Sequence, residues 1–179
     1  GPAAPHERTV LLAPSWGQSA IFQKYGGRII EVLLKTGYHI VIRPHPQSFT
    51  AEKELMEKLL REYPESEQLE WNRDNDNFEV LRRADILISD FSGVIFDAWW
   101  LETPYWTFTA LPRIGQKLTA DNLAALKEMI DACLTDPKYA QGRQEARAET
   151  WEHKGEGVKR AVDYLVDKYQ ELTTVEEEK

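Results

Sequence analysis

The chain has 179 residues, 42% of them hydrophobic and 29% charged, which is the composition of a globular protein with one domain-sized core. This composition excludes the collagenous, low-complexity and disordered classes. With 30 acidic and 22 basic residues the net charge is −8 at pH 7, which argues against a mainly electrostatic nucleic-acid binder, because phosphate neutralisation needs a basic face.

Short apolar runs alternate with stretches of helical spacing along the chain. Apolar runs bounded by Pro, Gly or polar residues predict buried strands, whereas apolar residues that recur every three or four positions predict helices. The expected strands are 9–13, 38–43, 68–71, 86–88 and 105–108. The expected helices are 29–37, 50–63 with Thr50 as its N-cap, 78–81, 94–101, 121–134, 137–150 and 157–172, followed by an acidic, solvated tail over 173–179.

This alternation predicts βαβ units and therefore an α/β fold of the Rossmann-like class, a parallel sheet flanked by helices. We expect the domain to occupy residues 9–172. In such sheets ligands bind beyond the carboxyl ends of the strands, where the strand order reverses. The segments that follow the strands are therefore the places to look for a site, and three of them carry unusual residues.

The first segment, from Pro14 to Gln18, follows the first expected strand. Ser15 offers a hydroxyl, Trp16 offers a flat face, and the small residues let backbone N–H groups approach a ligand. Strand termination, with Trp16 packed into the core, explains the same residues, and taken alone the segment favours that interpretation. The chain has neither a P-loop nor the three-glycine dinucleotide fingerprint, which argues against NTP hydrolysis and NAD chemistry.

The second segment is Arg43-Pro44-His45-Pro46, in which two prolines restrict the backbone on both sides of one imidazole. A histidine placed rigidly at this edge could donate a hydrogen bond to a phosphate oxygen, or protonate a leaving group near neutral pH. A turn histidine that bonds a backbone carbonyl fits equally well. Arg43 is expected to be structural, or to place a charge near the same ligand.

The third segment, from Ser89 to Asp97, is a buried strand that runs into a polar turn and an apolar helix. Ser92 and Gly93 fall at the start of that helix, where unpaired N–H groups and the positive end of the helix dipole bind anions such as phosphates. Asp97 lies one turn later and could accept hydrogen bonds from ribose hydroxyls. A plain N-cap, a tight turn and a surface acid explain the same three residues, and taken alone the segment favours that interpretation.

Taken together, Ala13-Pro14-Ser15-Trp16, Arg43-Pro44-His45-Pro46 and the segment from Ser89 to Asp97 resemble, in this order and spacing, the CDP-glycerol glycerophosphotransferase family. The resemblance extends over residues 9–172. It implies the C-terminal, donor-binding half of a GT-B architecture, in an enzyme that transfers glycerol phosphate or a related polyol phosphate to teichoic-acid-like polymers. Gly17-Gln18 and Phe91-Ser92-Gly93 depart from the family's usual pattern, which has an Arg in the first motif and two serines with Tyr in the last.

The resemblance also implies roles for individual residues. His45 corresponds to the family's histidine near the donor phosphates and is the implied catalytic residue. Ser92 and Gly93 correspond to the pyrophosphate-binding turn, and Asp97 to the acid at the ribose. The full implied substrate-binding set is Ser15, Trp16, Arg43, His45, Asp90, Ser92, Gly93 and Asp97.

The implied partners are CDP-glycerol or a similar nucleotide-diphosphate donor, a polyol phosphate or glycan acceptor, and an N-terminal GT-B half that this chain lacks. We expect no cofactor, no metal and no nucleic acid. The same phosphate turn and ribose acid also resemble those of UDP-N-acetylglucosamine 2-epimerase, so a UDP-sugar enzyme of this type is the first alternative. A nucleotide-binding module without catalysis is the second.

The remaining features concern the setting of the chain. Cys133 is the single cysteine, so no internal disulfide is expected, and no Cys/His cluster has metal-site spacing. No apolar run reaches the roughly 20 residues of a membrane helix. We therefore expect a cytoplasmic protein, with peripheral membrane association left open for the full-length form. The start Gly1-Pro2 is typical of a cleaved tag, so residues 1–8 are expected to be a tag remnant and linker in front of part of a longer protein.

Overall fold

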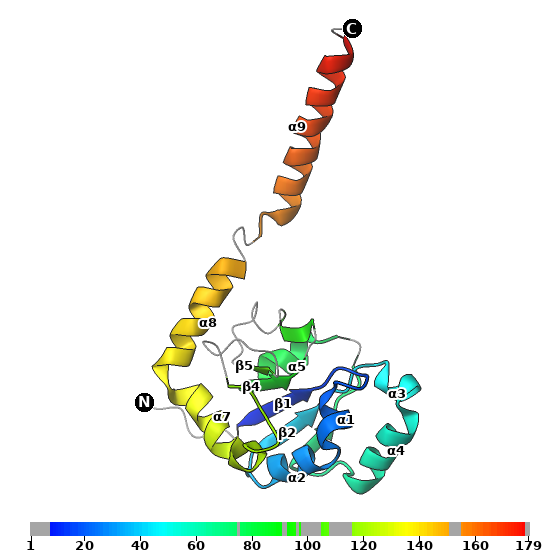
Figure 1. Ribbon diagram of the computed structural model, residues 1–179, viewed down its shortest axis with the longest axis vertical. Coiled ribbons are helices and arrows are strands. Elements are labelled where there is room, and N and C mark those ends of the chain that lie inside the picture. Colours follow the sequence, from blue (N-terminus) through cyan, green and yellow to red (C-terminus); the bar gives the residue numbers. More distant parts are fainter. Residues whose placement is uncertain are drawn as a thin grey trace. The chain divides into compact units, whose positions relative to one another are not determined.

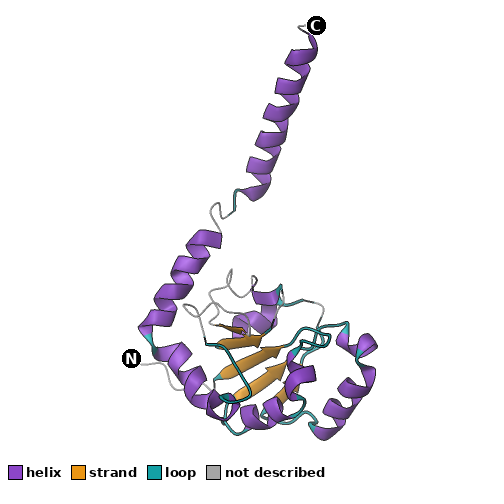
Figure 2. Cartoon of the chain, in the orientation of Figure 1, coloured by secondary structure: helices purple, strands orange, loops and turns teal. Residues whose placement is uncertain are grey.

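Five parallel strands form one sheet in the first part of the chain (Figures 1 and 2). The computed structural model describes residues 8–74, 76–90, 93–95, 97, 105–107, 116–150 and 155–177. The strands are β1 (Thr9–Ala13), β2 (His39–Ile42), β3 (Leu69–Trp71), β4 (Ile86–Ser89) and β5 (Tyr105–Thr107). Their order across the sheet is β3-β2-β1-β4-β5, which confirms the predicted Rossmann-like α/β class.

The helices follow the predicted pattern, with one additional short helix after β1. Val94, Ile95 and Asp97 are also helical, and the rest of the helix expected over 94–101 lies outside the described residues. The helices are α1 (Ile21–Tyr25), α2 (Arg28–Leu34), α3 (Ser48–Ala51), α4 (Lys53–Glu62), α5 (Phe78–Arg83), the 3₁₀ turn η1 (Leu123–Ala125), α7 (Leu126–Thr135), α8 (Pro137–Thr150) and α9 (Gly157–Glu177).

By its internal contacts the chain divides into two units, Gly1–Glu145 and Ala146–Lys179. The sheet belongs to the first unit and α9 to the second, so the single domain expected over 9–172 spans parts of both. Helix α9 also continues into the segment where we expect a solvated tail. The sequence gives a reason for this, because Val175 extends the helical apolar spacing of the residues before it.

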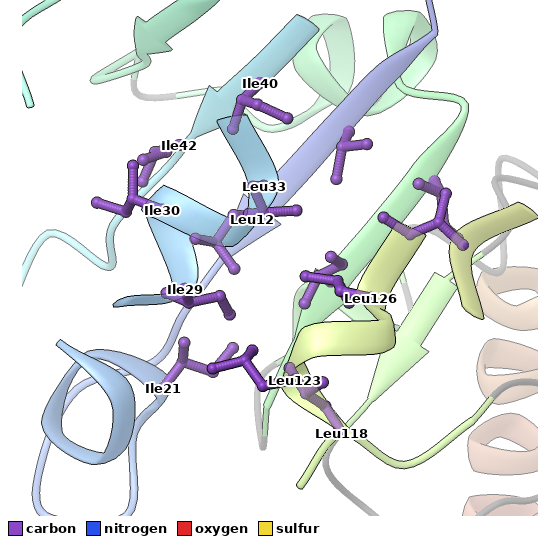
Figure 3. Close-up of a cluster of buried hydrophobic side chains, with 14 of the residues drawn as sticks. Leu12, Ile21, Ile29, Ile30, Leu33, Ile40, Ile42, Leu118, Leu123 and Leu126 are labelled. Atoms are coloured by element: carbon purple, nitrogen blue, oxygen red, sulfur yellow. The ribbon is translucent and has the colours of Figure 1, made fainter. Parts of the chain in front are cut away.

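The core lies on both faces of the sheet. Alternate strand residues share a face, and on one face they pack against α1, α2 and α7 (Figure 3). Leu11, Val41 and Leu87 point to the other face and are also fully buried, and α5 packs against β1 there. Burial on both faces explains why the strand sequences are continuous apolar runs. The cluster in Figure 3 includes Leu12, Ile21, Ile29, Ile30, Leu33, Ile40, Ile42, Leu118, Leu123 and Leu126.

Two local differences from the prediction concern the starts of helices. Thr50 lies inside α3, where its hydroxyl donates to the carbonyl of Gln47 at 3.0 Å, so it is not the N-cap of one long helix. Glu52, with a φ of −127°, separates α3 from α4. Helix α1 has only five residues, too few to show a helical period, and its first two residues, Ile21 and Phe22, are buried in the core.

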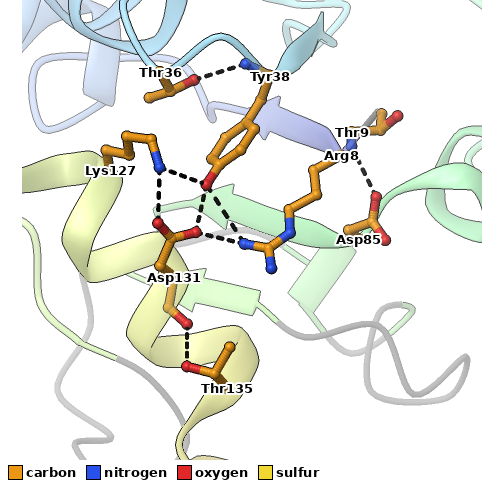
Figure 4. Close-up of polar contacts among 8 residues, drawn as sticks. All are labelled: Arg8, Thr9, Thr36, Tyr38, Asp85, Lys127, Asp131 and Thr135. Atoms are coloured by element: carbon orange, nitrogen blue, oxygen red, sulfur yellow. Dashed lines mark hydrogen bonds and ion pairs between the residues drawn. The ribbon is translucent and has the colours of Figure 1, made fainter. Parts of the chain in front are cut away.

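A polar network joins α7 to the starts of β1 and β2 (Figure 4). The Asp131 carboxylate accepts hydrogen bonds from the Tyr38 hydroxyl, from the Arg8 guanidinium, and from the Lys127 ammonium at 2.9 Å. Partial burial disfavours the ionised carboxylate, but the bonds from Tyr38 and Lys127 and the charge of Arg8 outweigh burial, so the pKa of Asp131 is lowered.

Among the described residues, no helix has both the length and the apolar character needed to cross a bilayer.

Candidate functional site

A pocket opens at the carboxyl edge of the sheet, where the strand order reverses. Strand β1 lies between β2 and β4, so the segments that follow these three strands meet there. The pocket has a volume of about 330 Å³. It draws on all three segments that the sequence singles out. Its lining residues are Ala13, Pro14, Arg43, Pro44, His45, Pro46, Asn77, Gly93, Val94 and Asp97.

The side chain of Arg43, the residue after β2, makes three hydrogen bonds to described residues. Its Nε donates to Asn77 Oδ1 at 2.7 Å, and its Nη1 donates to Asn72 Oδ1 at 2.7 Å and to the Asp74 carbonyl at 2.6 Å. Burial lowers the pKa of the guanidinium, and the negative charges of Asp74 and Asp76 oppose that change. Arg43 is thus a cation fixed in the wall of the pocket.

His45 lines the pocket with an exposed ring. Its Nδ1 accepts a hydrogen bond from the Gln47 backbone N–H at 3.1 Å. A ring nitrogen that accepts carries no proton, so the neutral ring in this geometry has its proton on Nε2. Nε2 is therefore the donor that His45 can offer to a ligand oxygen. An imidazolium, with protons on both nitrogens, would lose the bond to Gln47.

Trp16 lies on the surface and not in the core. Its side chain is 48% exposed, which corrects the interpretation that it packs inside. Its ring centroid is 6.4 Å from that of His45, with the rings tilted by 35°. The backbone joins the same two segments, since the His45 N–H donates to the Pro14 carbonyl at 3.2 Å. Ser15, half-buried, belongs to the same loop.

Asp90 has a different setting from the ligand contact we expect of it. The side chain is 3% exposed, and each carboxylate oxygen accepts a backbone N–H bond, from Ser15 at 2.7 Å and from Ile21 at 2.9 Å. Both carboxylate oxygens therefore bond to the loop after β1. Asp90 is not among the residues that line the pocket.

Gly93 and Asp97 both line the pocket and are exposed. A Cβ added to Gly93 would meet no atom within 4 Å, and the φ of Gly93 is not in the left-handed region. The space beside Gly93 is thus open to a ligand, and the backbone there would accept another residue. Ser92, the other member of the expected phosphate turn, lies outside the described residues.

Asn77 is a site residue that the sequence analysis missed. Its Oδ1 accepts from Arg43, and its Nδ2 donates to Asp97 Oδ2 at 3.4 Å, so it links the motif after β2 to the expected ribose acid. Asn77 comes directly before α5, where an Asn is normally read as a cap. In the structure its side chain forms no cap bond and bonds Arg43 and Asp97 instead, which the local sequence does not indicate.

A second pocket, of about 360 Å³, shares Arg43, Pro44 and Pro46 with the first and adds Phe49, Arg73 and Asp74. The Arg73 guanidinium lies 5.2 Å from the centroid of the Phe49 ring. Within the described part of the chain, no group of His, Cys, Asp and Glu side chains is arranged to hold a metal ion.

Comparison with known proteins gives a family match and several structural matches. The family model described as CDP-glycerol:poly(glycerophosphate) glycerophosphotransferase matches residues 4–110. The wall teichoic acid polymerase TagF is 18% identical with a TM-score of 0.55, over 96% of this chain and 46% of that chain. The UDP-GlcNAc 2-epimerase of Methanocaldococcus jannaschii is 17% identical with a TM-score of 0.55, over 80% of this chain and 46% of that chain.

The glycotransferase of kitacinnamycin is 15% identical with a TM-score of 0.54, over 89% of this chain and 42% of that chain. No curated protein sequence matched the chain significantly. Identities this low show the fold alone, which is that of one half of a GT-B architecture. The chain spans less than half the length of each of these three structures.

Proposed function

Since the chain belongs to the CDP-glycerol:poly(glycerophosphate) glycerophosphotransferase family, we propose that it is the donor-binding part of a transferase. The enzyme moves glycerol phosphate, or a related polyol phosphate, from a CDP-activated donor to a polyol phosphate or glycan polymer of the cell surface. The other half of the GT-B site is contributed by sequence outside this chain. TagF, more than twice as long as the matched region, is named as a polymerase of wall teichoic acid.

The pocket at the carboxyl edge of the sheet is the observation that carries the proposal. It brings the His45 ring, the open space beside Gly93 and the Asp97 carboxylate to one hollow. A nucleoside diphosphate needs donors for its phosphates and an acceptor for its ribose hydroxyls. His45 Nε2 and the helix start after Ser92 and Gly93 supply the donors in this proposal, and Asp97 supplies the acceptor.

Three further residues complete the proposed donor site. Arg43, fixed by its bonds to Asn72 and Asn77, adds positive charge near the phosphates. Ser15 and Trp16 border the donor on the side of the loop after β1. Trp16 is suited to this role because its ring is exposed and lies beside that of His45.

In the proposed reaction an acceptor hydroxyl oxygen attacks the β-phosphorus of the donor. The bond from that phosphorus to the bridging oxygen breaks, and CMP leaves with that oxygen. The hydroxyl proton passes to a general base in the other GT-B half. Hydrogen bonds from His45 and from the helix start stabilise the charge that builds on the departing CMP. This chain alone should therefore bind the donor without turning it over.

Calorimetric titration of this chain tests the proposal. We expect CDP and CDP-glycerol to bind more tightly than CMP, which lacks the second phosphate, and UDP-N-acetylglucosamine to bind more weakly than CDP-glycerol. Gly93→Val should weaken CDP binding by about tenfold or more, because a branched side chain fills the space proposed for a phosphate.

Gly157→Val is the matched control. Gly157, like Gly93, has open space at its Cβ position and a φ outside the left-handed region, but it lies on α9. The control should bind CDP as the wild type does. Absence of CDP binding by the wild-type chain, or equal affinity in Gly93→Val, contradicts the proposal, as does steady release of CMP from CDP-glycerol by this chain alone.

A further inference from the structure

We propose that Asp90 is a positioning residue, which fixes the loop after β1 and thereby holds Trp16 beside His45 at the pocket. Asp90 acts through backbone N–H groups and does not touch the ligand. The expected effect of the loop on donor binding rests on the proposed function, because it requires that the pocket binds a nucleotide donor. The anchoring of the loop itself does not depend on it.

Two hydrogen bonds carry the inference. Asp90 Oδ1 accepts from the Ser15 N–H at 2.7 Å, and Oδ2 accepts from the Ile21 N–H at 2.9 Å. Ser15 is where the loop leaves β1, and Ile21 is where it enters α1. One carboxylate, 3% exposed, therefore holds both ends of the loop. Bonds to an ionised acceptor are stronger than neutral ones, which suits a residue with this task.

Helix α1 has no cap of its own. Its N-cap residue, Ala20, has no side-chain acceptor, and the N–H of Ile21 has no partner within the helix. Asp90 supplies that acceptor from the end of β4, 69 residues later in the chain. The start of α1 is thus fixed to the sheet by tertiary contact, and the loop before it has a defined end point.

The rest of the loop is tied down in the same way. The Gly17 N–H donates to Glu52 Oε1 at 3.2 Å, and the Ala20 N–H donates to the Gly17 carbonyl at 2.8 Å. Next to Asp90, the Ser89 hydroxyl donates to the Ala13 carbonyl at 2.7 Å. Between these fixed points Trp16 projects into solvent, near the ring of His45.

The same geometry makes direct ligand contact unsuitable for Asp90. An ionised carboxylate has only acceptors, as a phosphate has, so the two would repel each other. Because both Asp90 oxygens already accept N–H bonds, the negative charge is directed at the loop.

The test is Asp90→Asn, compared with Asp85→Asn. Like Asp90, Asp85 uses its carboxylate to accept a backbone N–H from another segment: its Oδ2 accepts the Thr9 N–H at 2.8 Å. This bond lies where β1 and β4 begin, at the opposite end of the strands from Asp90. The amide in Asp90→Asn keeps the side-chain shape and turns one acceptor into a donor that faces an N–H group. Amide hydrogen exchange should then accelerate about tenfold or more at Ser15 or Ile21 and stay unchanged there in Asp85→Asn.

A second readout follows Trp16. In chain labelled with 5-fluorotryptophan, with the resonance assigned through Trp16→Phe, the Trp16 signal should shift in Asp90→Asn only. CDP affinity should fall about tenfold in Asp90→Asn and not in Asp85→Asn. The inference is overturned if Ser15 and Ile21 in Asp90→Asn exchange as in the wild type, or if the Trp16 signal of that variant does not shift. An equal loss of CDP affinity in Asp90→Asn and Asp85→Asn also overturns it.

The wild-type chain gives a test that needs no variant to fold. Ser15 and Ile21 should exchange at least tenfold more slowly than Gln18 and Ser19, whose amides donate no hydrogen bond in the described part of the chain. Equal rates at these four amides overturn the inference. If the wild type does not bind CDP, the proposed function fails, and the exchange and fluorine results still decide the role of Asp90.

Discussion

Asp131→Asn removes the charge at the centre of the network that joins α7 to the sheet (Figure 4). In the wild type, one carboxylate oxygen accepts from Tyr38 and Arg8 and the other from Lys127. The amide can still accept one hydrogen bond, but it offers no charge to the two cations. We therefore expect a chain that folds normally and is less stable.

The size of the effect follows from how exposed the network is. Hydrogen bonds to charged groups contribute about 1.5–3 kcal/mol when they are buried. The Asp131 side chain is 35% exposed, and exposed ion pairs contribute only about 0–1 kcal/mol because solvent screens them. We expect a loss of about 1 kcal/mol, which should lower Tm by about 2–4 °C in a chain of this length.

The pH dependence has a definite sign. The pKa of Asp131 is lower in the folded protein than its usual value of 3.8, so the native state favours the ionised carboxylate. The stability from this group is complete above the unfolded pKa and is lost as the pH falls through the folded one. The difference in Tm between wild type and Asp131→Asn should therefore be full at pH 7 and narrow as the pH falls below 3.8.

Thermal unfolding followed by circular dichroism at several pH values tests this reasoning. Asp163→Asn is the matched control, because Asp163 also pairs with the lysine four residues before it, Lys159, at 3.0 Å. That pair is far more exposed, at 57% for Asp163, and should contribute no more than about 0.5 kcal/mol. Equal melting of Asp131→Asn and wild type at pH 7, or a difference that does not change in acid, refutes the argument.

Three other changes are predicted. His45→Ala should weaken CDP binding by about one to two decades in titration calorimetry, because it removes a donor to a phosphate, and unchanged affinity would leave His45 as a turn residue. Asn77→Ala should reduce the preference for CDP over 2′-deoxy-CDP, because Asp97 loses its hydrogen bond; an unaltered preference argues against the ribose role. Gly27→Ala places a Cβ against the Tyr63 ring and should cost about 1–3 kcal/mol. It should also bring the pKa of Tyr63, which burial and the bond to Glu31 raise to about 12, back toward 10.0 in a spectrophotometric titration, whereas an unchanged titration shows that the ring keeps its place.

The sheet was predictable from the sequence because its strands are buried on both faces. Continuous apolar runs such as those of β1 and β2 admit few other arrangements, and their boundaries agree with the prediction within one or two residues. Helix α1 was not predictable in the same way. It is shorter than two turns, and its start is fixed by Asp90, which lies far away in the chain.

The pocket was predictable in its location and only partly in its members. Parallel strands deliver the segments after them to one edge, which places His45 and Gly93 together without further information. The anchors of Arg43 are a different case, since Asn72 and Asn77 lie 29 and 34 residues further along the chain. The polar segment that contains Asn72 and Asn77 predicts only a loop. No local sequence pattern indicates that this loop contacts Arg43.

Asp90 shows how strand alternation could have decided between two roles. In β4, Ile86 and Ile88 belong to the core cluster on the face covered by α1, whereas Leu87 points to the other face. A residue two positions after Ile88 continues toward the first face, which is the side on which Asp90 bonds the start of α1. A carboxylate aimed at backbone N–H groups in a buried place can remain there only if those groups satisfy it. The alternation therefore favours a positioning role for Asp90, whereas the motif alone suggests a ligand contact.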